Sequence, residues 1–432
     1  MSDYQKHYRK QTEKQMSIIT TENVNEIIRK TLGIVNEKLV QHGEIVGYIL
    51  NRMLTYEGKY TKKEMWEYTM LGMLHDLGLF REGKHIDMDR HEYESPWSHS
   101  IYGFLFLKCL SPLGDKADIV LYHHLDYNRY HHIESDNMHI IECLAVADKM
   151  ANFMQGGIDV MGADYFARNR NITFSNKAFN LFRYAEQAFS IRAKLTTGEY
   201  REEFYEALNK IAYTESQKKA FLEMIVYLID FRSEHTVVHT MSTVNFAVQL
   251  GKLLHLSSND VNQLYYGALL HDIGKIAIPL NILESTGRLS DDEMRVMKAH
   301  VRITEMILED CIDDEIVKIT ARHHEKLDGS GYHKGLKEND LTFPQQIVAV
   351  ADILSALYGK RSYKESFDSS LIKKIINEDA DNYKISKKAV GCLMDNYDDV
   401  IANYEQEKDT TVGLYLKIKE QFGIIMKKFE HL

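Results

Sequence analysis

The order of apolar and polar residues along the chain predicts helices over most of its length. Long stretches carry apolar residues three and four positions apart, and this spacing places them on one face of an α-helix. Only four prolines interrupt these stretches, namely Pro96, Pro112, Pro279 and Pro344. A chain of 432 residues is also longer than one ordinary core requires, so we expect two or three domains. The pattern therefore predicts an all-α protein.

The same pattern divides the chain into segments. A polar tail precedes two helical units, a helical connector separates the units, and further helices follow the second one. The predicted boundaries are 1–23 for the tail, 24–155 for the first unit, 156–220 for the connector, 221–370 for the second unit and 371–432 for the C-terminal helices.

The two predicted units contain related sequences. MLGMLHDLG at 70–78 is similar to GALLHDIG at 267–274, and AVAD occurs at 145–148 and again at 349–352. A repeat of whole units is longer than the periods of solenoid proteins, so it predicts tandem domains.

Composition narrows the class of protein. With 44% hydrophobic and 27% charged residues, no apolar run long enough to cross a membrane and a polar N-terminus, we expect a soluble, cytoplasmic protein. The net charge of −10 argues against general binding to duplex nucleic acid or anionic membranes. An anionic substrate would need a local cationic pocket. The cysteines lack a C-x-x-C spacing, so we expect four reduced thiols: Cys109, Cys143, Cys311 and Cys392.

Histidines and aspartates recur in the same order in both halves, and each series contains a His-Asp dipeptide that ends an apolar helical run. The later series is His239, His271, Asp272, His300, His323, His324 and Asp352. The earlier series is His42, His75, Asp76, His99, His123, His124 and Asp148. A duplicated fold places ligand-type residues at similar intervals twice, so a metal-dependent hydrolase is our leading hypothesis.

The chemistry of the later series follows from its residue types. An aspartate next to a histidine can bridge two metal ions while the histidine holds one, and we expect His271 and Asp272 at the buried end of a helix. Asp352 stands in an apolar helix, where an ionised carboxylate is costly unless it faces a cation. On a helix His323 and His324 would point about 100° apart and serve neighbouring ions.

Two further residues extend this set. His235 and His239 are four residues apart, so we expect them on one helix face as ligands to a shared site. Lys275 follows His271 by four residues and could neutralise a phosphate oxygen in the same pocket. Taken singly, a buried histidine is more often a core residue and a lysine is more often solvated. The ordered series, present twice, favours the metal hypothesis.

The ligand types also indicate the metals. Imidazole and carboxylate without thiolate suit iron, manganese, nickel or zinc, and we rank iron and manganese first among divalent ions. Two ions about 3.5–4 Å apart can hold a bridging hydroxide and clamp a phosphate for in-line attack.

These residues resemble the HD superfamily of metal-dependent phosphohydrolases. The C-terminal half is similar to the HD-GYP branch, which hydrolyses cyclic dinucleotides, chiefly cyclic di-GMP. The resemblance rests on HDIGKIAIP (271–279), His300, HHEKLDGSGYH (323–333), AVADILSAL (349–357) and RSYK (361–364).

The resemblance implies a role for each matching residue. It implies metal ligation by the later series, with Asp272 and Lys275 at the reacting phosphate. Arg361 and Lys364 would contact the dinucleotide. Gly331 and Tyr332 would form a tight turn that supports the site and docks partners.

Three positions depart from the family pattern. His333 stands where the signature has proline, and Ser362 replaces the proline of the R-P-Y-K motif. His235 stands where members with three metals carry a glutamate, so the number of ions, two or three, stays open.

The N-terminal half resembles an HD domain that lacks the parts specific to this branch. Leu79 stands where the later half has Lys275, and HHLDYNRY (123–130) replaces the HHE and GY stretch. The earlier series therefore predicts either a second metal site or a degenerate domain that packs against the active one.

Together these observations predict a phosphodiesterase that cleaves cyclic di-GMP to linear pGpG, GMP or both. One alternative keeps the chemistry and changes the substrate to cyclic GMP-AMP or another nucleotide. A second alternative, of another class, is a dinucleotide receptor or a scaffold that binds a partner without turnover. A homo-oligomer and a signalling protein partner both stay open.

Overall fold

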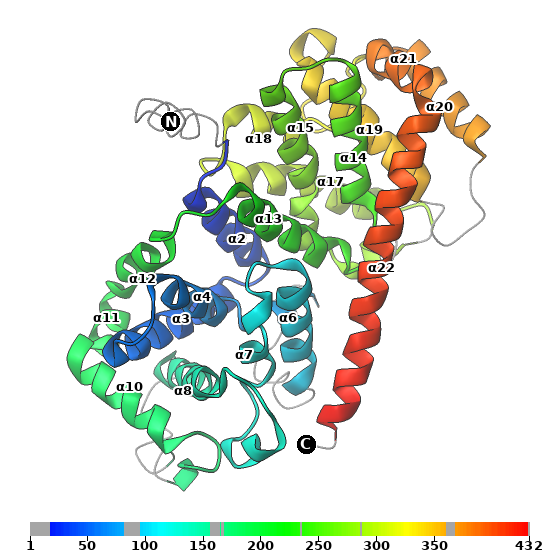
Figure 1. Ribbon diagram of the computed structural model, residues 1–432. Coiled ribbons are helices and arrows are strands. Elements are labelled where there is room, and N and C mark those ends of the chain that lie inside the picture. Colours follow the sequence, from blue (N-terminus) through cyan, green and yellow to red (C-terminus); the bar gives the residue numbers. More distant parts are fainter. Residues whose placement is uncertain are drawn as a thin grey trace, which may run out of the picture. The chain divides into compact units, whose positions relative to one another are not determined.

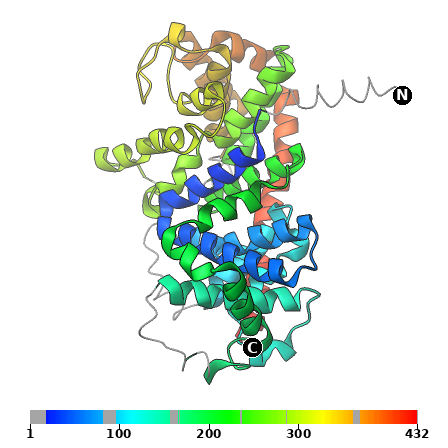
Figure 2. The same ribbon diagram turned by 90° about the vertical axis from the view of Figure 1, so that its left-hand side faces the viewer.

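The computed structural model describes residues 18–81, 96–155, 165, 168–233, 236–285, 287–359 and 368–430. Within these ranges the chain consists of α-helices joined by turns and short 3-10 helices (Figures 1 and 2). No β-strand forms in the described ranges, where two isolated bridges occur. The predicted all-α class is confirmed. None of the described helices combines the length and apolar character needed to span a bilayer.

The chain divides into two compact units. Unit 1 comprises Met1–Thr31 and Thr214–Leu416, and unit 2 comprises Leu32–Tyr213 and Lys417–Leu432. Two of the three points of division lie within helices, one in α2 (Thr21–Val35) and one in α22 (Tyr397–Phe429).

Unit 1 is built around three central helices that pack against one another, α14 (His239–Leu253), α15 (Ser258–Leu270) and α19 (Phe343–Gly359). Its other elements are α13 (Glu215–Asp230), η4 (Ile273–Ala277), α16 (Leu280–Leu283), α17 (Asp291–Leu308), α18 (Asp314–Ala321), η5 (Glu338–Asp340), α20 (Ser369–Asp381) and α21 (Lys387–Asp395). Polar caps begin several of these helices; Ser290 and Glu293, for example, form a capping box on α17.

Unit 2 has a corresponding centre in α3 (Glu37–Glu57), α4 (Lys62–Met73) and α8 (Met138–Gln155). Its other elements are η1 (Leu77–Arg81), α6 (Pro96–Leu110), η2 (Gly114–Lys116), α7 (Asp118–Leu121), η3 (Tyr127–His132), α10 (Asn176–Phe189), α11 (Ile191–Thr197) and α12 (Tyr200–Asn209).

The repeated sequences correspond to a repeated order of elements. In unit 1 the order is α14, α15, η4, α17, α18 and α19, and in unit 2 it is α3, α4, η1, α6, α7 and α8. In each unit the His-Asp dipeptide stands in the turn after a helix, and a 3-10 helix follows it. The duplication inferred from sequence spacing is thus visible in the elements that carry the two series.

The division into units differs from the predicted domain boundaries in three places. Helices α10 to α12, in the predicted connector, group with unit 2. Residues 24–31 of α2, expected in the first helical unit, group with unit 1. Helices α20 and α21 also belong to unit 1. Amphipathic periodicity shows which face of a helix is apolar, but it does not say which neighbour covers that face.

Helices α3 and α4 approach closely because small residues face the contact. A Cβ atom added to Gly43 would lie 2.3 Å from the carbonyl oxygen of Met73, and the backbone cannot easily move away. By contrast, a Cβ atom on Gly423 in α22 would meet no atom within 4 Å.

We therefore expect Gly43→Ala to destabilise the protein by about 1–3 kcal/mol through overpacking. The matched control, Gly423→Ala, should be neutral or stabilising by up to about 1 kcal/mol because alanine is the better helix former. Urea denaturation followed by far-UV circular dichroism measures both, and equal midpoints for the two variants would contradict the proposed close contact.

Candidate metal centres

The later series of histidines and aspartates lies together in unit 1. His239 begins α14, His271 caps the end of α15, and Asp272 precedes η4. The remaining four residues come from other elements: His300 from α17, His323 and His324 from the turn after α18, and Asp352 from α19. Apart from His239 and His324, whose exposure is intermediate, all are buried.

Asp272 stands between two groups of ligands. Its Oδ2 lies 3.2 Å from His239 Nε2 and 3.1 Å from His271 Nε2. Its Oδ1 lies 3.2 Å from His300 Nε2 and 3.9 Å from His323 Nε2. The carboxylate therefore presents one oxygen to each group, as a ligand that bridges two metal ions would.

Asp352 and His324 complete the two groups. Asp352 Oδ1 lies 3.2 Å from His239 Nε2 and 3.6 Å from His271 Nε2. His324 Nδ1 lies 3.5 Å from Asp352 Oδ2. We call His239, His271, Asp352 and Asp272 Oδ2 the first ligand group of unit 1. The second ligand group is His300, His323, His324 and Asp272 Oδ1.

The tautomers of these histidines fit metal ligation. His271, His300 and His323 each place Nδ1 at 2.6–2.7 Å from the carbonyl oxygen three residues earlier in the chain. A carbonyl can only accept, so each Nδ1 carries the proton. In the neutral ring the lone pair then sits on Nε2 and faces the carboxylate oxygens.

Buried lone pairs that face one another need a cation between them. His271 Nε2 and Asp272 Oδ1 are buried without a hydrogen-bond partner. An orphaned buried acceptor is costly, and two facing acceptors also repel each other. Divalent ions among these atoms would remove both penalties, so the residues present fit a metal centre.

The charges of the centre follow from the same geometry. Burial disfavours the charged form of His271, but Asp272 and Asp352 outweigh it and raise its pKa to about 10. Burial lowers the pKa of His300 to about 4 and that of His324 to about 3. The pKa of Asp272 lies well below its usual range, because His271 and Lys275 outweigh the opposing effect of burial. Without metal, His271 is therefore protonated at neutral pH, whereas His300 and His324 are neutral. Metals bind neutral imidazole and ionised carboxylate, so a metal ion at His271 Nε2 would take the place of this proton.

Lys275 reaches the centre, as its spacing from His271 suggested. Its Nζ lies 2.5 Å from Asp272 Oδ2. Burial opposes the ammonium charge, but Asp272 outweighs that effect and raises the pKa of Lys275, which keeps it protonated. Arg232 is buried and donates to the carbonyls of Ile276 at 2.7 Å and Ile278 at 3.3 Å, which supports the segment carrying Lys275.

Further side chains that spacing did not indicate hold the ligands in place. Ser355 Oγ donates to the carbonyl of His239 at 2.8 Å and accepts from His239 Nδ1 at 3.0 Å. Thr304 Oγ1 donates to the carbonyl of His271 at 3.1 Å and accepts from the amide of Gly274 at 3.0 Å. Ser355 lies one turn after Asp352 on α19, and that position was the available sequence signal.

The signature loop folds tightly beneath the second ligand group. A Cβ atom on Gly331 would lie 2.4 Å from the amide nitrogen of Lys326, so only glycine fits. The amide of Tyr332 donates to the carbonyl of His324 at 3.2 Å, and the two rings lie 4.6 Å apart between centroids. Buried Glu325, also not indicated by spacing, accepts from two backbone amides of the loop at 2.6 and 2.9 Å.

One expectation about the histidine pairs was wrong. His323 and His324 do not lie on a helix, because α18 ends at Ala321; both stand in the following turn and group with His300. Helix α14 begins at His239, and residues 236–238 form a turn before it. His235, Arg361 and Lys364 lie outside the described residues, and their roles stay predictions.

The earlier series also comes together, within unit 2. The members group as His42, His75 and Asp148 on one side and as Asp76, His99, His123 and His124 on the other. Leu79, which stands at the position of Lys275, is buried.

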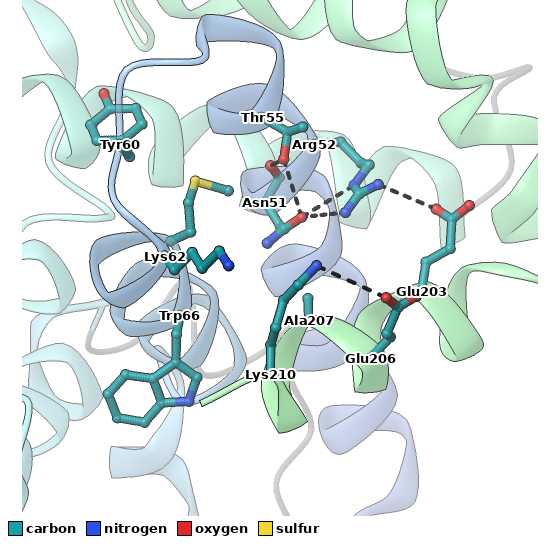
Figure 3. A pocket seen from close by; sticks show the side chains of 11 residues that line it. Asn51, Arg52, Thr55, Tyr60, Lys62, Trp66, Glu203, Glu206, Ala207 and Lys210 are labelled. Atoms are coloured by element: carbon teal, nitrogen blue, oxygen red, sulfur yellow. Dashed lines mark hydrogen bonds and ion pairs between the residues drawn. The ribbon is translucent and has the colours of Figure 1, made fainter. Parts of the chain in front are cut away.

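A separate pocket of about 440 Å³ lies between α3, α4 and α12 of unit 2 (Figure 3). Arg52 Nη1 lies 3.6 Å from Glu203 Oε2, and Lys210 Nζ lies 3.9 Å from Glu206 Oε1. These cations are therefore paired with acids of the pocket itself. No member of the earlier series of histidines and aspartates lines this pocket.

The comparisons with known proteins agree with this geometry. Residues 223–386 match a family described as "HD domain". The C-terminal half is therefore similar to HD domains over these residues.

The four cysteines are free thiols in the structure, as their spacing predicted.

Two curated relatives show how far the similarity extends. The cyclic di-GMP phosphodiesterase response regulator RpfG of Xanthomonas campestris is 34% identical over 44% of this chain and 49% of its own length. The 3'3'-cGAMP-specific phosphodiesterase 1 of Vibrio cholerae is 23% identical over 85% of this chain and 90% of its own. This chain spans half or less of the length of several of the curated relatives it matches.

One solved structure has the same fold over most of the chain. The crystal structure of a cyclic GMP-AMP-specific phosphodiesterase from V. cholerae aligns with a TM-score of 0.54 and 16% identity, covering 88% of this chain and 98% of that one.

Ser355 provides a test of the supporting hydrogen bonds. We expect Ser355→Ala to weaken metal binding by about 10–100-fold, because His239 loses the partner that orients its ring. The matched control is Ser242→Ala, since that hydroxyl donates to the carbonyl of Val238 within α14. Competition with a chromophoric chelator measures the affinity for Mn²⁺, and an unchanged affinity in the Ser355 variant would refute this role.

Proposed function

We propose that unit 1 is a metal-dependent phosphodiesterase that cleaves a 3′–5′ phosphodiester of a cyclic dinucleotide. The observation that carries the proposal is Asp272, whose two oxygens face separate groups of imidazoles with Lys275 beside them. The relatives named as cyclic di-GMP and 3'3'-cGAMP phosphodiesterases support the same substrate class.

The first and second ligand groups of unit 1 would hold two divalent transition-metal ions, and His235 is the candidate ligand for a third. Iron and manganese suit the imidazole and carboxylate donors best among the ions we consider. Such ions supply activated water and charge neutralisation at phosphate oxygens.

The residues of the chain contribute positioning and charge. Lys275 is held in the pocket by Asp272 and stays protonated, so its ammonium can stabilise negative charge that develops on the reacting phosphate. Tyr332 covers His324 and limits how that imidazole can turn. We assign Arg361 and Lys364 to the second phosphate of the dinucleotide, as the family motif implies.

The dinucleotide itself has two candidates. Cyclic di-GMP is our first choice, since the HD-GYP resemblance and the relative with 34% identity both point to it. Cyclic GMP-AMP is favoured by the length of another match, because the 3'3'-cGAMP-specific relative aligns with both halves of this chain. A receptor that binds without turnover is the alternative from another class, and the departure at His333 from the signature supports it.

Asp272→Asn tests the proposed function. We expect hydrolysis to fall by about 100-fold or more, because the bridging ligand is lost, while the helical circular dichroism stays unchanged. Purified protein with Mn²⁺ or Fe²⁺ is incubated with cyclic di-GMP, 3'3'-cGAMP and cyclic di-AMP, and the products are separated by chromatography. The control is Asp292→Asn, an exposed carboxylate on α17. Turnover that persists in the Asp272 variant would overturn the mechanism, and turnover absent from the wild type would favour the receptor.

Lys275→Met tests the role of the ammonium separately from metal binding. We expect kcat to fall by about 10²–10³-fold, as for loss of one group that stabilises the transition state, with the metal content retained. Lys252→Met on the exposed side of α14 is the control. An unchanged kcat in the Lys275 variant would show that this lysine does not contact the reacting phosphate.

A further inference from the structure

We propose that unit 2 holds a second pair of divalent transition-metal ions, in a centre that stabilises this unit and does not hydrolyse cyclic dinucleotides. The part of the chain matched by the HD family begins at residue 223, so it does not include this centre. The inference is carried by the earlier series of histidines and aspartates and stands apart from the function proposed for unit 1.

The first ligand group of unit 2 is His42, His75, Asp148 and one oxygen of Asp76. Asp148 Oδ1 lies 3.0 Å from His42 Nε2 and 3.8 Å from His75 Nε2. Asp76 Oδ2 lies 3.2 Å from His75 Nε2. Imidazole nitrogens and carboxylate oxygens thus converge from α3, the turn after α4 and α8.

The second ligand group of unit 2 forms around the other oxygen of Asp76. Asp76 Oδ1 lies 3.5 Å from His99 Nε2 and 3.6 Å from His123 Nε2. His124 Nε2 lies 2.8 Å from His99 Nε2. Asp76 therefore presents one oxygen to each group, in the arrangement that Asp272 has in unit 1.

Two orphaned nitrogens point to a cation in this centre. His75 Nδ1 lies 2.8 Å from the carbonyl of Gly72, and His123 Nδ1 lies 2.6 Å from that of Val120, so both Nδ1 atoms carry protons. Their Nε2 atoms are buried, face Asp76 and have no hydrogen-bond partner. A degenerate set that served packing alone would leave these buried acceptors unsatisfied.

An outer layer of amides orients the first ligand group. His42 Nδ1 donates to Gln155 Oε1 at 3.1 Å, and Asn152 Nδ2 donates to Asp148 Oδ1 at 3.2 Å. Unit 1 uses the hydroxyl of Ser355 for the corresponding histidine. Hydrogen bonds of this kind fix the ring and tautomer of metal-ligating histidines. Gly78, two residues after Asp76, lets η1 pack closely against α6, because a Cβ atom on Gly78 would lie 2.0 Å from the carbonyl oxygen of His99.

The surroundings of Asp76 argue against hydrolysis of a cyclic dinucleotide. Leu79 replaces the lysine and is buried, so this position supplies no cation for a phosphate. A small cleft beside Asp76 is lined by apolar side chains, among them Leu39, Met73 and Phe80. Metal ions in this centre would instead cross-link the elements that carry the ligands, namely α3, α4, α6, α7 and α8. A metal ion that binds only the folded state stabilises the folded state.

The test is the number of metal ions per chain. With both centres filled, we expect about four transition-metal ions in the wild type, or one more if unit 1 binds three, by mass spectrometry of protein purified without chelators. Asp76→Asn should carry two ions fewer per chain, melt at a lower temperature and keep its turnover of cyclic dinucleotides. The control, His131→Gln, changes an exposed histidine of unit 2 outside the cluster and should leave the metal content unchanged.

A second variant guards against loss of fold. His42→Gln removes a ligand of the first group and should lower the metal content by one ion with unchanged circular dichroism. Two or three ions in the wild type, or a metal content unaffected by Asp76→Asn and His42→Gln, would overturn the proposal. Loss of turnover in an Asp76 variant that keeps the metals of unit 1 would contradict the non-hydrolytic role. Ion counts decide the inference even if the activity proposed for unit 1 is not found.

Discussion

Everything in the two centres depends on buried lone pairs that face one another. In each unit one aspartate stands between imidazoles whose Nε2 atoms carry lone pairs, and neither partner can satisfy the other. A buried acceptor without a donor costs free energy, and a carboxylate facing several such nitrogens costs more. Cations resolve the conflict. The packing around the centres therefore makes sense as the packing of a site built to hold metal.

Helix ends produce this arrangement. The last carbonyls of a helix have no partner within the helix, and a nearby side chain can satisfy them. His271 and His323 bond through Nδ1 to the carbonyls of Ala268 and Thr320, which lie in the last turns of α15 and α18. His75 and His123 do the same at the ends of α4 and α7. One hydrogen bond thus completes the helix end, selects the tautomer and aims Nε2 at the centre.

The two units show how chemistry can differ on a shared frame. Both have the same order of elements, and both have a glycine that lets the 3-10 helix pack against the next ligand helix. They differ at the position after that glycine, which is Lys275 in unit 1 and Leu79 in unit 2. A charge placed beside the carboxylate distinguishes a site suited to phosphate from one suited to metal alone. Function therefore resides in the site and not in the fold.

The sequence by itself determined the all-α class, the duplication and the identity of the candidate ligands, because helical periodicity and residue spacing are local properties. It could also indicate Lys275, which is one turn from His271. Only the tertiary structure decided which ligands share a group, and it placed His323 and His324 together in a turn after α18. Ser355, Thr304 and Arg232 support the site through contacts between residues far apart in the chain. Such contacts depend on which helices pack against one another. A periodic pattern identifies the apolar face of a helix, but it does not identify the helix that covers this face.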